Sequence, residues 1–172
     1  EGGETTASGR YSHAEGWATT ASGDWSHSEG QYATASGSYS HAEGQGIASG
    51  QAAHAEGSGG TKASGNASHA EGDFSVASGS RSHAEGEETI ASSYDQHVQG
   101  KYNIEDTTNG YAHIVGNGSG SDNRSNAHTL DWNGNAWYKG DVKIGGTSYD
   151  DSAAKALATI DDVRPDVKNT ID

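Results

Sequence analysis

Residues 7–16 read Ala-Ser-Gly-Arg-Tyr-Ser-His-Ala-Glu-Gly, and close copies of this stretch fill the first hundred positions of the chain. The Ala-Ser-Gly element returns at Ala21, Ala35, Ala48, Ala63 and Ala77, and decays to Ala-Ser-Ser at Ala91. The histidine returns every 13 to 15 residues. A period near 14 residues is too short for a helical repeat, which needs roughly 30 or more. It suits one coil of a parallel β-structure, made of two short strands and two turns.

Strand geometry gives each coil one face with polar side chains and one face with small side chains. Successive side chains of a strand point in opposite directions. In the Ser-His-Ala-Glu-Gly segment, alternation therefore sends His13 and Glu15 to one side and Ser12, Ala14 and Gly16 to the other. Side chains this small predict a very narrow interior. Since each coil buries little apolar surface, we expect several chains to associate.

Composition narrows the class of protein further. Leu, Ile, Val and Phe together number only 16 of 172 residues, which excludes a conventional globular core. Low hydrophobicity with a net charge of −14 is typical of disorder, but the regular period favours a repeat structure instead. The acidic charge argues against nucleic acid as a partner, because nucleic acid requires a basic surface. No apolar run is long enough for membrane insertion, and the absence of cysteine excludes thiolate metal sites.

The repeat resembles a known family. The pattern Ala-Ser-Gly-x-x-Ser-His-Ala-Glu-Gly is similar to the YadA-like head repeat of trimeric autotransporter adhesins, and residues 1–100 hold seven near-exact copies. The resemblance implies a left-handed parallel β-roll in which three chains pack side by side. Histidine and glutamate stand where the adhesin repeat usually carries Val and Ile. This variant resembles copies in phage and prophage tail proteins of Gram-positive hosts, and the neck motif of the adhesins is not recognisable.

The sequence after residue 100 divides into three further segments. Residues 101–126 hold a degenerate last repeat around His113 and a turn-rich connector. Residues 127–146 predict a β-hairpin, because Asn133-Gly134 between β-prone runs is a strong hairpin signal. This stretch also resembles the C-terminal region of phage tail and baseplate fibres. Residues 147–172 predict a short helix over 153–158, or the start of a stalk.

These segments together predict an all-β fold. It is a left-handed parallel β-roll (solenoid) of 14-residue repeats that forms a homotrimer, followed by a β-hairpin connector and a short helical or extended tail. Glu1-Gly2 lies one period before Glu15-Gly16, so we expect the natural protein to extend upstream.

Two residue types repeat once in each coil and predict a structural ladder. The histidines are His13, His27, His41, His54, His69, His83 and His97, and the glutamates are Glu15, Glu29, Glu43, Glu56, Glu71 and Glu85. Stacked His and Glu can supply metal ligands. A ladder in which each imidazole meets a neighbouring Glu, within the chain or across the trimer, fits a repeated position better, so we expect no metal and no cofactor. Protonation near the ordinary imidazole pKa of ~6.5 would change a buried ladder in a direction that the sequence leaves open.

Aromatic residues mark the variable turn positions. Tyr11, Trp25 and Tyr39 are each 14 residues apart and should stack along one edge, while Trp17 and Tyr32 lie in the other turn. Exposed aromatic faces bind sugars, so these five residues are the candidate ligand-binding residues. The alternative is that they pack between coils or between chains.

Three functional hypotheses follow. The preferred one is a segment of a phage or prophage tail fibre in the virion, which attaches to a glycan or protein receptor on the bacterial surface. The second is the head of a bacterial surface adhesin that binds host matrix or cells. The third is a fibre whose catalytic domain lies outside this segment. The segment itself is expected not to be an enzyme, because Ser12 and His13 point to opposite faces and cannot form a catalytic pair.

Overall fold

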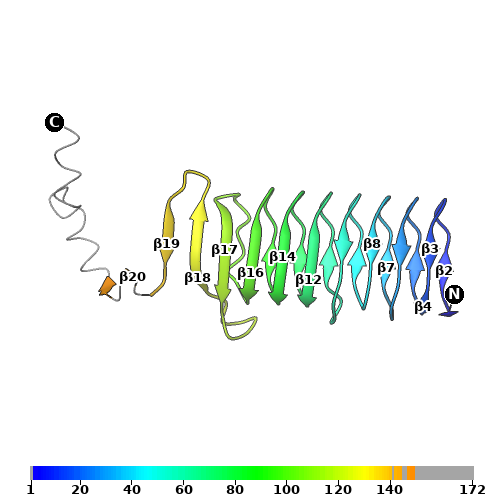
Figure 1. Ribbon diagram of the computed structural model, residues 1–172, viewed down its shortest axis with the longest axis horizontal. Coiled ribbons are helices and arrows are strands. Elements are labelled where there is room, and N and C mark those ends of the chain that lie inside the picture. The colour runs from blue at the N-terminus through cyan, green and yellow to red at the C-terminus, as the bar shows by residue number, and fades with distance from the viewer. Residues whose placement is uncertain (1, 141, 145–146, 150–172) are drawn as a thin grey trace. The chain divides into compact units, whose positions relative to one another are not determined.

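The computed structural model describes residues 2–140, 142–144 and 147–149, and these residues are all-β with no helix. Residues up to Trp137 form one compact unit, and the residues from Tyr138 onward belong to a second. The first unit is a β-solenoid of about 8 turns, which confirms the prediction of stacked parallel coils (Figure 1).

Each coil contributes one strand to each of two sheets. The larger sheet contains β3 (His13–Ala14), β6 (His27–Ser28), β8 (His41–Ala42), β10 (His54–Ala55), β12 (His69–Asp73), β14 (His83–Glu87), β16 (His97–Lys101), β17 (Tyr111–Asn117), β18 (Asn126–Asp131) and β19 (Ala136–Tyr138). The smaller sheet contains β2 (Thr6–Ala7), β5 (Thr20–Ala21), β7 (Thr34–Ala35), β9 (Ile47–Ala48), β11 (Lys62–Ala63), β13 (Val76–Ala77) and β15 (Ile90–Ala91). A separate parallel pair joins β1 (Gly2–Gly3) to β4 (Gly16–Trp17).

The coils stack in register, so equivalent residues lie above one another. His13 pairs with His27, and the same match of histidine with histidine continues to His97 and His113. Backbone N–H groups of one coil donate to carbonyls of the next, as Thr20 does to Ala33 at 2.9 Å. These hydrogen bonds satisfy the backbone although most strands are only two residues long.

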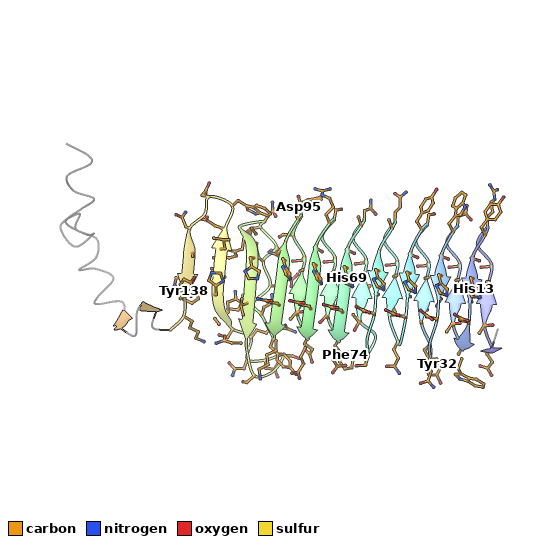
Figure 2. The ribbon with its side chains drawn as sticks, in the orientation of Figure 1. His13, Tyr32, His69, Phe74, Asp95 and Tyr138 are labelled. Carbon is orange, nitrogen blue, oxygen red and sulfur yellow. The ribbon has the colours of Figure 1, made fainter. Side chains whose placement is uncertain are left out.

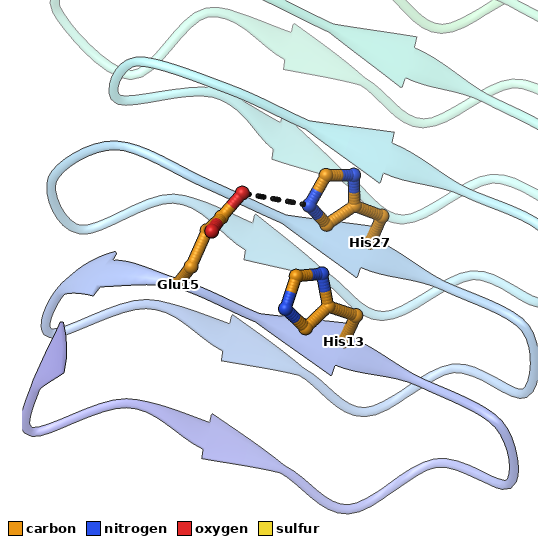
Figure 3. Close-up of side chains that lie close together, drawn as sticks. All are labelled: His13, Glu15 and His27. Carbon is orange, nitrogen blue, oxygen red and sulfur yellow. Dashed lines mark ion pairs between the residues drawn. The ribbon is translucent and has the colours of Figure 1, made fainter. Parts of the chain in front are cut away.

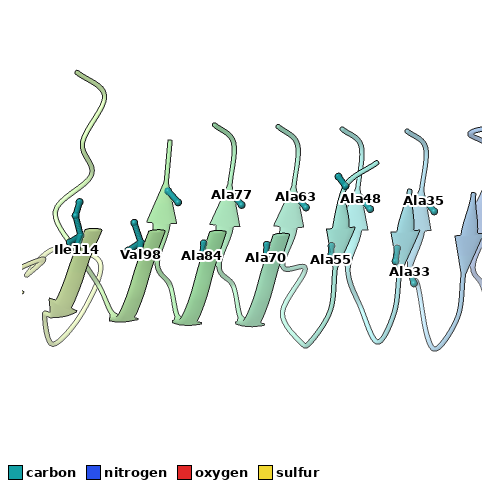
Figure 4. Packing of buried hydrophobic residues seen from close by; sticks show 13 residues of the cluster. Ala33, Ala35, Ala48, Ala55, Ala63, Ala70, Ala77, Ala84, Val98 and Ile114 are labelled. Atoms are coloured by element: carbon teal, nitrogen blue, oxygen red, sulfur yellow. The ribbon is translucent and has the colours of Figure 1, made fainter. Parts of the chain in front are cut away.

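The interior is a column of small side chains. Alanines from both sheets are fully buried along the solenoid, and Val98 and Ile114 take their place only near its end (Figure 4). The interior serines also have hydrogen-bond partners: the Ser26 hydroxyl donates to the Gly23 carbonyl at 2.7 Å. The His and Glu side chains lie on the outer face and Ala14 is buried, as predicted. Gly16, which the alternation places inside, is instead exposed, and its positive φ of 108° interrupts the regular strand geometry.

Glycine rows mark where the backbones of adjacent coils approach most closely. A Cβ built on Gly65 would lie 2.0 Å from the Gly79 carbonyl oxygen, and equivalent contacts repeat from coil to coil. The last member of this row is Ser93, whose hydroxyl donates to the Asp106 carbonyl at 2.6 Å. Ser93 can carry a side chain because the residues that follow it no longer form a regular coil with a glycine at this position.

Side-chain amides end the smaller sheet. The Asn103 Oδ1 atom accepts a hydrogen bond from the Ile90 N–H at 2.7 Å, and its Nδ2 atom donates to the Ile90 carbonyl at 3.0 Å. Asn103 thus replaces the backbone of a further strand beside β15. The larger sheet continues instead through β17, which pairs in parallel with β16 and antiparallel with β18.

The segments after the solenoid are described only in part. β18 and β19 are neighbours in the sheet, and the chain turns between them at Asp131–Asn135, with Gly134 at a φ of 86°. In the second unit, β20 (Val142–Ile144) pairs antiparallel with β21 (Thr147–Tyr149). The predicted helix over 153–158 lies outside the described residues, and the role of residues 127–146 as a connector stays a prediction.

Substitution of one interior glycine tests the close approach of adjacent coils. Gly65→Ala should lower the free energy of unfolding by on the order of 3 kcal/mol or more, because its Cβ would meet rigid backbone. Gly120→Ala is the matched control: no atom lies within 4 Å of its Cβ, and we expect a change within about 0.5 kcal/mol. Urea unfolding followed by circular dichroism measures both. Equal stability of the two variants would contradict the close packing of the coils.

Candidate functional site

The aromatic row consists of Tyr11, Trp25 and Tyr39, at one edge of the solenoid. The rings of Tyr11 and Trp25 have centroids 5.8 Å apart, and those of Trp25 and Tyr39 lie 4.9 Å apart and nearly parallel. All three side chains are 46–76% exposed. The structure therefore brings three of the five predicted ligand-binding residues together as one continuous stack.

Backbone conformation explains why these side chains point outward. Each member of the aromatic row has a positive φ of 56° to 61°, the left-handed conformation that turns the chain between strands. The same conformation recurs at the same turn in Ala52, Ala67, Arg81 and Asp95. The fold thus accepts several residue types at this position, and aromatic residues are confined to the first coils.

Arg81 and Asp95 form a polar continuation of this edge. The Arg81 Nη2 atom donates to Asp95 Oδ2 at 2.9 Å. The hydrogen bond from the guanidinium lowers the pKa of the Asp95 carboxyl below its usual value. Both groups are exposed, so the pair adds little to stability. The edge therefore changes from aromatic to charged along the solenoid.

Trp17 and Tyr32 lie at the opposite turn, where Figure 2 also shows Phe74. They occupy successive positions of the turn rather than the same one: Tyr32 has a positive φ, as does Ala18, the residue after Trp17. The Tyr32 N–H donates to the Trp17 carbonyl at 2.9 Å. Phe74 takes the position of Tyr32 in a later coil and is exposed, a residue that sequence reasoning missed and that aligning the turns would have found.

The imidazole column is formed by the seven repeat histidines, from His13 to His97, on the outer face of the larger sheet (Figure 2). Adjacent rings stack with centroids 4.6 to 4.9 Å apart and interplanar angles of 2° to 17°. His113 and His128 extend the column with tilted rings. Burial lowers the pKa of the His113 imidazole, and neighbouring His97 and His128 lower it further.

The carboxylate column is formed by the six repeat glutamates, from Glu15 to Glu85, beside the imidazoles. From His27 onward, each histidine faces the glutamate of the preceding coil in the same chain, as His27 faces Glu15 in Figure 3. The Nε2–Oε1 distances of the six pairs are 3.4 to 3.6 Å, longer than a hydrogen bond. Six of the Nε2 atoms are buried with no hydrogen-bond partner, although the side chains are about a third exposed.

An open groove of about 580 Å³ runs beside the carboxylate column. Glu56, Glu71, Glu85 and Gln99 line it, together with the glycines that follow them and Val115. The groove is therefore acidic along most of its length and suits cationic rather than anionic groups.

The interior serines are turned away from the histidines. The Ser26 side chain is buried and bonded to the Gly23 carbonyl, whereas His27 lies on the outer face. The geometry supports the expectation that adjacent Ser and His do not form a nucleophile–base pair.

Asp106 is a buried polar residue that sequence reasoning did not identify. Burial acts to raise the pKa of its carboxyl, but hydrogen bonds from the Thr108 hydroxyl and from the backbone N–H groups of Tyr111, Thr108 and Gly110 outweigh it, so the net pKa is lowered. Gln96 also donates to Asp106 at 3.0 Å. Asp106 thus organises the loop that follows the last regular coil.

Comparison with known proteins gives no family. The chain matches no protein-family model, and no curated protein is significantly similar to it. Among the described residues, no helix has the length and apolar character needed to cross a membrane.

The Asp106 carboxylate should make stability depend on pH. Because its pKa is lower in the folded state, its contribution is present above the unfolded pKa of ~3.9 and is lost as the pH falls through the folded value. Asp106→Asn should cost about 2 kcal/mol at pH 7, and the difference from wild type should shrink in acid. Thermal unfolding between pH 7 and pH 3 measures this. The exposed Asp122→Asn is the control, and an equal effect of both variants would contradict the assignment.

Proposed function

We propose that this chain is a structural and receptor-binding segment of a trimeric phage or prophage tail fibre, which attaches the virion to the bacterial cell surface. The single observation that carries the proposal is the exposed aromatic row on a repetitive β-solenoid. The resemblance of the Ser-His-Ala-Glu-Gly repeats to those of phage tail proteins supports it. The receptor is a surface glycan or protein, recognised through the flat apolar faces of the rings.

The small interior of each coil supports the trimer in this proposal. The interior buries mainly alanine and serine, while twelve large apolar side chains are 38% exposed or more among the described residues. Exposed rings that lie next to one another, as in the aromatic row, form apolar surface that another chain or a receptor can cover. Three chains packed side by side in left-handed rolls would cover part of it and leave the turn edges free for a receptor.

The alternative function is the head of a bacterial surface adhesin that binds host matrix or cells. The stacked parallel coils favour it as much as they favour the fibre. The two proposals differ in location and target: the virion and a bacterial receptor in the first, the bacterial surface and an animal receptor in the second. In a third version, the segment only carries a catalytic domain that lies elsewhere.

The solution mass tests the trimer. Sedimentation equilibrium at neutral pH should give a mass close to three times the 17.6 kDa of one chain, because a single solenoid leaves too much apolar surface uncovered. Crosslinking at low protein concentration is an independent check. A monomer of 17.6 kDa across the concentration range would contradict the trimer.

Cell binding tests the receptor surface. Labelled protein should bind intact Gram-positive cells, and Y11A/W25A/Y39A should weaken binding by about tenfold or more, because it removes the stacked rings. Alanine is accommodated at this turn, as Ala52 and Ala67 already occupy it.

The matched control is R81A/D95A, which changes the same turn position in later coils and should leave cell binding intact. Binding by the aromatic variant equal to that of wild type would exclude the aromatic row as the receptor surface. Binding to animal cells or matrix proteins alone would favour the adhesin function.

A further inference from the structure

The imidazole and carboxylate columns contain ready-made groups of metal ligands. In five clusters, one ligand atom from each of three residues lies within 4.8 Å of the others. The clusters are His13, Glu15 and His27; His27, Glu29 and His41; His83, Glu85 and His97; Glu43, His54 and Glu56; and Glu56, His69 and Glu71.

Although the sequence alone favours a ladder without metal, we propose that these clusters bind zinc ions, each held between imidazole Nε2 atoms and glutamate carboxylates of adjacent coils. The distances between paired atoms fit coordination of a shared metal ion. The Nε2 and Oε1 atoms of each pair are 3.4 to 3.6 Å apart. Two ligands of a tetrahedral zinc ion, each about 2.0–2.1 Å from the metal, lie roughly 3.4 Å apart.

The lack of hydrogen-bond partners at the imidazole nitrogens also supports metal coordination. The Nε2 atoms of His27, His54 and His97 are buried, face a carboxylate and have no hydrogen-bond partner, and three other members of the column share this arrangement. A buried nitrogen without a partner is costly. Coordination through its lone pair satisfies it and neutralises the facing carboxylate at the same time.

The donor set selects the metal. Imidazole nitrogen together with carboxylate oxygen suits zinc, whereas Mg²⁺ and Ca²⁺ prefer oxygen ligands alone. The third residue of a cluster completes three protein ligands after a small rotation of its side chain, and water fills the remaining position because the columns are partly exposed.

Shared residues set the number of ions. Two clusters share His27 and two share Glu56, so the five clusters provide at most three sets with no residue in common. Ions in adjacent coils would also repel each other strongly, since the repulsion between divalent charges is four times that between unit charges. Each chain is therefore expected to bind three zinc ions.

Equilibrium dialysis of the intact protein against ZnCl2, with excess MgCl2 and physiological salt, measures the zinc bound per chain. We expect three ions on wild type. A histidine variant that removes at least one imidazole from every cluster should bind zinc about tenfold more weakly or not at all: H27Q, H54Q, H69Q and H97Q combined.

A second variant removes carboxylates and keeps every imidazole. It combines E15Q, E29Q, E56Q and E85Q, which also touches all five clusters, and we expect the same loss. The control H113Q/H128Q removes two imidazoles of the extended column that belong to none of the clusters, and it should keep three ions. Circular dichroism checks that each variant retains the β-fold, and if the histidine variant does not fold, the carboxylate variant decides.

Three results would overturn the proposal. The first is that wild type binds no zinc, and the second is that MgCl2 displaces the zinc completely. The third is that a folded carboxylate variant binds as much zinc as wild type does. The second result would reduce the columns to a general acidic surface, and the third would assign any zinc to imidazoles alone.

Discussion

The close approach of backbone to backbone between adjacent coils is the constraint on which the rest of the structure depends. At the glycine rows, the carbonyl oxygen of one coil occupies the space that a Cβ of the previous coil would need, as at Gly65 and Gly79. Hydrogen bonds between coils hold this spacing along the whole solenoid. Only Ala, Ser and Thr fit most of the interior, so every larger side chain is forced outward or into the left-handed turns.

Exact stacking turns each outward position into a column of identical groups. Stacking favours the rings of the aromatic row, because offset parallel aromatic rings attract one another. It is unfavourable for the carboxylates, which repeat with like charge one coil apart. The imidazoles lie directly beside these carboxylates: from His27 onward, each one faces the glutamate of the preceding coil, as His41 faces Glu29 at 3.4 Å. The outward positions of the larger sheet thus form a polar surface in which like charges repeat from coil to coil.

The sequence predicts the regular part of this structure because one short pattern is repeated under one geometry. The period gives the stacked coils, and strand alternation places Ala14 inside and His13 outside. The pairing of each histidine with the preceding rather than its own coil depends on the register between coils, which the pattern of a single coil does not contain. The roles of Asn103 and Asp106 were also beyond prediction, because both lie where the repeat has ended and each acts through contacts made only there.

The end of the solenoid shows how a repeat that could continue indefinitely is stopped. An exposed strand edge would offer unpaired N–H and carbonyl groups to another chain. Beside β15, the amide of Asn103 fills both hydrogen-bonding positions of Ile90, and the amide oxygen of Asn126 then accepts from Ile104. Beside β16, the strand β17 is followed by the antiparallel β18, which breaks the parallel register. One edge is therefore closed by side chains and the other by reversing the chain, and only the second leads the polypeptide onward to β19.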